Sequence, residues 1–200
     1  MFFRTKKIKG KEYAYIVENE WITTAKSVGL DASSRSREHI TLRGSDMRVS
    51  KRASHVISRP RKGSRQKVKG YLGRVYRFDL KNNVDFLEFL KIGNIEDCLN
   101  NDFKKIIKEL IEWELFKHGI TKNDFSIDLN NIKIQKNKKN VSFYINDGFM
   151  CELTLRNLLG FRVIEEQTDG YRFARCFVEA GIKVPKEVFI GLFGKLYIKE

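Results

Sequence analysis

The chain has 200 residues, of which 42% are hydrophobic and 12% aromatic, and its formal net charge is +14. This apolar content is too high for a disordered chain and is enough for a packed core in one domain or two small ones. The three cysteines, Cys98, Cys151 and Cys176, are odd in number and widely spaced, which excludes a disulfide scaffold. No apolar run approaches the roughly 20 residues that span a bilayer. We therefore expect a basic globular protein of a reducing compartment, the cytoplasm.

The excess positive charge lies in the first two-fifths of the chain. Residues 1–78 hold 20 Lys and Arg against 6 Asp and Glu, whereas residues 79–200 hold 19 of each. Within the first part, residues 35–77 carry 14 cations, most of them Arg, against Glu38 and Asp46. Like charges at this density repel one another unless a polyanion lies among them, and the guanidinium group suits phosphate. This basic segment predicts nucleic-acid binding, chiefly by phosphate contact; the alternative is a solvated loop without a dedicated partner.

The predicted contact residues are the cations of this segment and one tyrosine: Arg35, Arg37, Arg43, Arg48, Lys51, Arg52, Arg59, Arg61, Lys62, Arg65, Lys67, Lys69, Tyr71, Arg74 and Arg77. Tyr71, Tyr76 and Trp21 lie in or beside basic stretches, where an exposed ring would stack on an unpaired base. Packing within a small sheet is an equal alternative for each ring. No sequence signature chooses DNA over RNA.

In chain order, the first predicted elements are strands with alternating side chains, at residues 2–8, 12–22 and 66–78. The residues Lys9 to Lys11 form a turn between the first two, and the third strand is bent or bulged near Gly70 and Gly73. Residues 24–65 show almost no periodicity and are expected to form a mobile basic loop. Residues 1–80 are thus predicted to be a basic β module.

The remaining residues, 81–200, predict a neutral body of helices and strands. Helices are expected at 84–91, 95–99, 103–118, 149–159, 170–180 and 185–198, and strands at 125–129, 131–136 and 141–146. Asn83, Asn94 and either Asn101 or Asp102 are the predicted caps of the first three helices. The apolar face of 185–198 is expected in the core, or else as a docking face for a protein partner or a second copy. The fold class is therefore α+β: a small N-terminal sheet with a long basic loop, then helices, a three-strand segment and C-terminal helices.

No complete catalytic motif is present. The cysteines and histidines lack the spacing of a zinc site, so the cysteines are predicted to be small buried thiols. The strand and helix order over 125–159 resembles the opening of a ribonuclease H-like domain, whose first strand carries an Asp and whose following helix carries a Glu. Asp128 and Glu152 stand in comparable places, with Asp147 and Asp169 as further candidates. A Mg²⁺-dependent nuclease is therefore an alternative function, and no cofactor is expected otherwise.

Two N-terminal stretches resemble the start of insertion-sequence transposases of the DDE type. GKEYAYIVENEW and SRQKVKGYLGRVY share a Lys/Gly turn, a Tyr-rich strand ending in Val-Glu and an Arg-Gln-…-Tyr-Leu-Gly pattern, at Gly10, Tyr13, Tyr15, Val17, Glu18, Arg65, Gln66, Tyr71, Leu72 and Gly73. The resemblance implies a DNA-associated N-terminal module, although no complete D…D…E core can be laid out in this chain. Residues 113–119, 146–151 and 177–189 are similar to archaeal proteins of about this size. Membership of a larger ribonucleoprotein assembly is a third interpretation.

Overall fold

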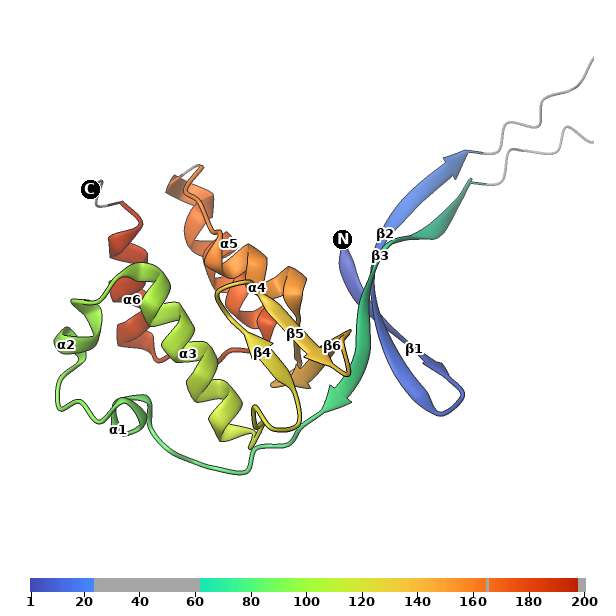
Figure 1. Cartoon of the computed structure of the whole chain (residues 1–200). Coiled ribbons are helices and arrows are strands. Elements are labelled where there is room, and N and C mark those ends of the chain that lie inside the picture. The colour runs from blue at the N-terminus through green and yellow to red at the C-terminus, as the bar shows by residue number, and fades with distance from the viewer. Residues whose placement is uncertain (24–61, 165, 198–200) are drawn as a thin grey trace, which may run out of the picture. The chain divides into compact units, whose positions relative to one another are not determined.

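The computed structural model describes residues 1–23, 62–164 and 166–197 (Figure 1). These residues form seven strands and six helices, which confirms the predicted α+β class. The chain divides into two units, residues 1–18 with 68–200 and residues 19–67. The predicted mobile loop falls almost entirely outside the described residues.

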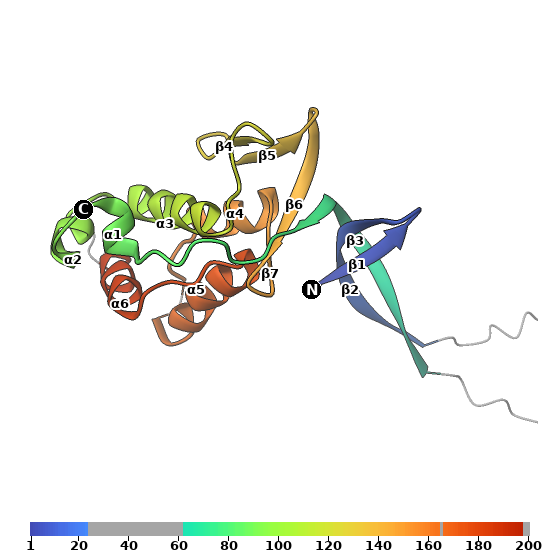
Figure 2. The ribbon, with the colours of Figure 1, turned by 90° about the horizontal axis from the view of Figure 1, so that it is seen from below.

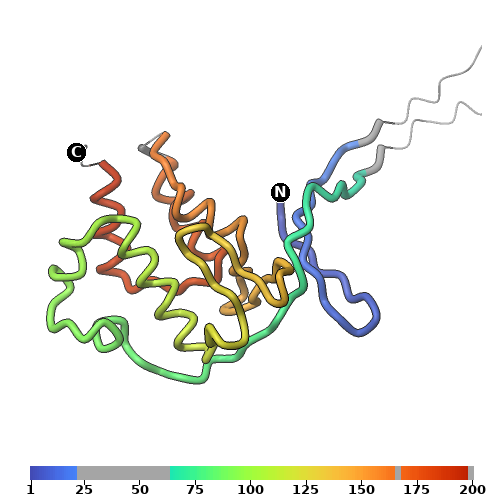
Figure 3. Tube along the Cα trace, in the orientation of Figure 1, coloured from blue at the N-terminus to red at the C-terminus, as the bar shows by residue number. Residues whose placement is uncertain are grey.

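A tight hairpin begins the fold. Strands β1 (Phe2–Ile8) and β2 (Lys11–Thr23) pair antiparallel, and Ile8 opposite Lys11 closes the ladder. The two residues between the strands, Lys9 and Gly10, have φ values of 49° and 76°. Such left-handed backbone is what a two-residue type I′ turn requires, and glycine adopts it without steric cost. The predicted hairpin and its turn are therefore confirmed, and Figure 3 traces them along the chain.

Strand β3 (Lys62–Arg77) joins the hairpin to the rest of the sheet. The strand order is β1-β2-β3-β6-β5-β4, with β7 paired to β6. The C-terminal part of β3 runs parallel to β6 (Lys139–Ile145), with Arg77 opposite Tyr144. Figure 2 shows how β3 leads from the N-terminal strands to the edge of β6. One sheet thus carries the N-terminal strands and the strands of the body.

The other body strands are short and antiparallel. β4 (Ser126–Asp128) and β5 (Lys133–Lys136) precede β6, so the three predicted strands are confirmed. A fourth strand, β7 (Gly148–Met150), occupies residues that the sequence predicts as the start of a helix. The tight turn at Asn146 and Asp147, where both φ values are positive, folds this apolar triplet back onto β6.

Six helices complete the body: α1 (Phe86–Leu90), α2 (Ile95–Leu99), α3 (Phe103–Lys117), α4 (Glu152–Leu159), α5 (Glu166–Ala180) and α6 (Lys186–Lys195). Asn94 caps α2 as predicted, and Asp102 caps α3, where its carboxylate accepts from Lys104 N at 3.0 Å. The cap of α1 is Asp85, not Asn83. Helix α5 begins before its predicted cap, so Asp169 lies inside the helix and accepts from Ile164 N at 2.8 Å.

The core lies between the body helices and the sheet. Its largest fully buried side chains include Phe86, Phe143, Phe173, Met150 and Leu155. Val188 and Leu192 of α6 are also buried, and the remaining rings of that helix pack against the same cluster, so the apolar face of 185–198 contributes to the core as predicted. Among the described residues, no helix combines the length and apolar character needed to cross a membrane.

Candidate nucleic-acid interface

The β1–β2 hairpin is strongly cationic. Residues 1–11 contain Arg4, Lys6, Lys7, Lys9 and Lys11 and no Asp or Glu. All five side chains are exposed, and the four lysines form no ion pair within the described part of the chain. We call these five residues the cationic hairpin. The charge of the four lysines is available to an external anion.

Three tyrosines gather beside these cations. The register of the hairpin sets Lys6 opposite Tyr13 and Arg4 opposite Tyr15, and residues directly opposite each other in an antiparallel pair share one face. The ring of Tyr71 on β3 lies 6.2 Å from that of Tyr13 and 5.5 Å from that of Tyr15, between centroids. Tyr71 is 56% exposed. One face of the N-terminal sheet therefore carries the tyrosine cluster, Tyr13, Tyr15 and Tyr71, next to basic side chains.

The hydroxyl group of Tyr71 stays protonated near neutral pH. Partial burial, followed by the neighbouring Tyr13 and Tyr15, raises the pKa of Tyr71 above its ordinary value of 10.0. Tyr71 therefore adds no negative charge near neutral pH, and its flat ring and O–H group are compatible with a polyanion.

Three of the predicted contact residues on β3 form ion pairs with glutamates of β2. Three ion pairs cross from β3 to β2: Lys67 to Glu20 at 4.0 Å, Lys69 to Glu18 at 2.7 Å and Arg77 to Glu12 at 2.9 Å. These glutamates are the only acidic residues in the first 23 positions. The hydrogen bond that Arg77 donates to Glu12 is also the main reason that the pKa of Arg77 is raised. Each acidic side chain of β2 thus forms an ion pair with a cation of β3.

The other predicted contact residues divide into two groups. Arg65 is exposed on β3, whereas the guanidinium of Arg74 lies 4.8 Å from the centre of the Tyr76 ring and its Nε is buried. Lys62 lies in β3 and its side chain is not described. The following predicted contact residues lie outside the described residues: Arg35, Arg37, Arg43, Arg48, Lys51, Arg52, Arg59 and Arg61.

The carboxylates proposed for a nuclease have separate partners. Asp128 accepts hydrogen bonds from the backbone N–H groups of Asn130 and Asn131, both at 3.0 Å, and from Nδ2 of Asn131 at 2.7 Å. These bonds hold the pKa of Asp128 below its ordinary value. Glu152 accepts from Asn140 Nδ2 at 3.0 Å and pairs with Arg156. In the described ranges, no three His, Cys, Asp or Glu side chains gather where they could hold a metal ion.

A buried polar cluster lies at the end of α3. The carboxylate of Glu114 is fully buried, 2.8 Å from Lys117 Nζ and 3.4 Å from His118 Nε2, and it accepts a hydrogen bond from Asn146. Lys117 Nζ also lies 3.5 Å from the centre of the Trp113 ring. His118 is the last residue of the helix predicted at 103–118, and no sequence pattern predicts this cluster. Its components belong to α3 and the β6–β7 turn, which only the fold brings together.

The cationic hairpin was also missing from the predicted contact residues. Its signal is present in the sequence, because KKIKGK carries four lysines in six residues without an acid. The predicted contact residues all come from residues 35–77, where 14 cations occur. No protein-family model, curated protein or solved structure matches the chain.

Proposed function

We propose that the protein binds nucleic acid through the cationic hairpin and the tyrosine cluster. The observation that carries the proposal is the five exposed cations of residues 1–11, with no acid among them, of which Arg4 and Lys6 lie opposite tyrosines of the cluster. Lysine and arginine neutralise phosphates and release condensed counterions, which supplies most of the sequence-independent affinity. Tyrosine rings stack on unpaired bases without requiring a particular sequence. Contact is therefore chiefly with the backbone.

The distribution of acids supports a polyanionic partner on this face. The glutamates of β2 form ion pairs with β3, and residues 1–11 contain no acid. Exposed ion pairs contribute little to stability, and a phosphate that approaches β3 can compete with them. The N-terminal resemblance to transposases favours DNA, and binding within a ribonucleoprotein assembly would use the same phosphate contacts. A cytoplasmic location belongs to the same proposal, since Cys98, Cys151 and Cys176 are free thiols.

Affinity measured against salt concentration tests the proposal. Fluorescence anisotropy with labelled DNA and RNA strands of about 12 nucleotides should give log K values that fall linearly with log salt, because each phosphate contact releases counterions. We expect a steep negative slope for both polymers. A flat line, or no binding at ~100 mM salt, would contradict the proposal.

A further inference from the structure

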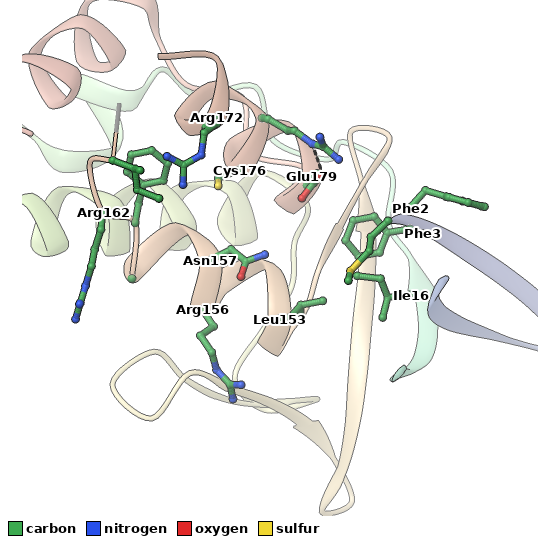
Figure 4. Close-up of a pocket in the computed structure, with 15 residues that line it drawn as sticks. Phe2, Phe3, Ile16, Leu153, Arg156, Asn157, Arg162, Arg172, Cys176 and Glu179 are labelled. Carbon is green, nitrogen blue, oxygen red and sulfur yellow. Dashed lines mark hydrogen bonds and ion pairs between the residues drawn. The ribbon is translucent and has the colours of Figure 1, made fainter. Parts of the chain in front are cut away.

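A groove opens between the first residues of the chain and helices α4 and α5. It has a volume of about 730 Å³, within the range of ligand sites. Figure 4 shows Phe2, Phe3 and Ile16 from the N-terminal strands on one side, with residues of α4 and α5 on the other. Phe3 stacks on Phe149 of β7, with ring centroids 5.4 Å apart and planes at 27°, which fixes the start of β1 beside the body.

Arginines predominate among the charged residues that line the groove. Four arginines line it, Arg156, Arg162, Arg172 and Arg175, whereas Glu179 is the acidic residue among the lining side chains. Arg175 pairs with Glu179 at 2.7 Å, and the partners of Arg156 and Arg172 do not line the groove. Arg162 is exposed and forms no ion pair with any described residue. We call this site the arginine groove, and its charge calls for an anionic occupant.

Flat apolar surfaces accompany these guanidinium groups. Phe2 is 38% exposed, and the partly buried ring of Phe161 lies 5.4 Å from the guanidinium carbon of Arg172. Rings and guanidinium groups together favour a ligand that has both a planar part and a negative part. A nucleotide has both: a base that stacks on a ring and a phosphate that a guanidinium binds through two donors.

We propose that the arginine groove receives a short unpaired stretch of the bound strand, with one base against Phe2 at one end of the groove and a phosphate at Arg162 at the other end (Figure 4). This inference rests on the proposed function and adds a preference for strand type. The bases of a duplex are stacked and paired, so a duplex must pay for unpairing before a base enters a groove, whereas a single strand already offers unstacked bases. The protein should therefore bind single strands more tightly than duplexes of the same sequence.

Two substitutions test the groove separately from the cationic hairpin. Phe2→Ala removes a stacking ring, and its matched control is Ile8→Ala, an apolar β1 residue 39% exposed that does not line the groove. Arg162→Gln removes one charge, and Lys186→Gln on α6 removes the same charge elsewhere. Affinities are compared for one oligonucleotide of about 12 residues as a single strand and as a duplex, by anisotropy at one salt concentration.

We expect Phe2→Ala to weaken single-strand binding at least about fivefold and to leave duplex binding within about twofold, because stacking on a ring is lost only where a base is unpaired. Arg162→Gln should likewise weaken single-strand binding more than Lys186→Gln does. Equal effects of each variant and its control, with wild-type binding intact, would overturn the inference and leave the proposed function standing. Absence of binding by the wild type would overturn both.

Cys176 supplies a second readout that does not depend on substitution. It is half-buried and lines the arginine groove, whereas Cys98 and Cys151 are buried elsewhere. A single strand in the groove should slow the alkylation of Cys176 by iodoacetamide severalfold and leave the rates of the other two thiols unchanged, which peptide mass spectrometry resolves. Unchanged alkylation of Cys176 at saturating oligonucleotide would contradict occupation of the groove.

Discussion

Glu114 shows how a single residue constrains the body of this protein. Its carboxylate is fully buried and lies next to the ammonium of Lys117, itself almost completely buried. The amide of Asn146 bonds the same carboxylate and also the carbonyl of Gly181, at 2.9 Å. Taking two charges out of water costs several kcal/mol for each ion, and mutual attraction offsets this only while both partners are present. The cluster therefore joins three segments of the chain. The buried charges of Glu114 and Lys117 are stable there only while both residues are present.

Replacing Glu114→Gln should destabilise the fold by about 3–5 kcal/mol, because the substitution leaves the buried ammonium of Lys117 without its counter-charge. Urea unfolding followed by circular dichroism measures the change in the free energy of unfolding. Glu112→Gln is the matched control on α3, because Glu112 pairs with Lys122 at 3.6 Å on the surface. Exposed pairs contribute about 0–1 kcal/mol. A Glu114→Gln variant as stable as the control would refute the role assigned to the cluster.

At the scale of elements, β3 is the strand on which the sheet depends. It contacts β2 on one side and β6 on the other. The close approach to β6 occurs at Gly73, whose φ is +113°, and an added Cβ would lie 2.4 Å from the carbonyl oxygen of Asn140. Neither backbone can move away without loosening the parallel pairing of β3 and β6. This position therefore requires glycine for both its conformation and its lack of a side chain.

Gly73→Ala should lower the free energy of unfolding by about 3 kcal/mol or more, because it combines a strained φ with a backbone clash. The control is Gly70→Ala in the same strand, whose Cβ would meet Ile16 Cγ2 at 3.4 Å, an ordinary contact. That substitution should change stability by less than about 1 kcal/mol, in part through the unfolded chain. Urea midpoints compare the two variants; similar midpoints would mean that the β3–β6 junction tolerates a side chain.

Elements with local signals could be predicted from the sequence. Asn94 and Asp102 begin helices where a capping side chain precedes an apolar repeat, and Gly10 marks the hairpin turn. Strand β7 was missed because its three residues are apolar and run directly into α4. The parallel pairing of β3 with β6 joins positions far apart in the chain, and no local pattern encodes it.

The candidate site could be predicted only as a class. The charge counts locate the basic N-terminal part and predict a phosphate-bearing partner, and the sequence predicts Tyr71 as a contact residue. Which cations remain uncompensated depends on the register of β1, β2 and β3, since it decides that Glu12, Glu18 and Glu20 pair with β3. The arginine groove was not predicted for the same reason: its lining comes from three separate parts of the sequence.

At the scale of the whole molecule, the described charges separate into a cationic hairpin and a body whose acids and bases are balanced. Residues 79–200 contain 19 of each sign, and many form ion pairs along helices, such as Arg175 with Glu179. The whole net charge of +14 therefore comes from residues 1–78. A polyanion should be attracted to that part at long range and bound there at short range.

The most direct measurement changes the location of charge and keeps its amount constant. One variant carries Lys6→Gln, Lys7→Gln and Lys9→Gln in the cationic hairpin. The other carries Lys104→Gln, Lys183→Gln and Lys186→Gln at exposed positions of the body. Both lose the same charge, and thermal melts verify that both remain folded. The slope of log K against log salt is then measured for one single-stranded oligonucleotide.

Each phosphate contact on a single strand contributes about 0.7 to the magnitude of that slope, so the hairpin variant should lose about 2 in slope together with most of its affinity at low salt. The body variant should keep the wild-type slope, because its lysines lie away from the hairpin. Equal slopes for the two variants would contradict binding through the cationic hairpin.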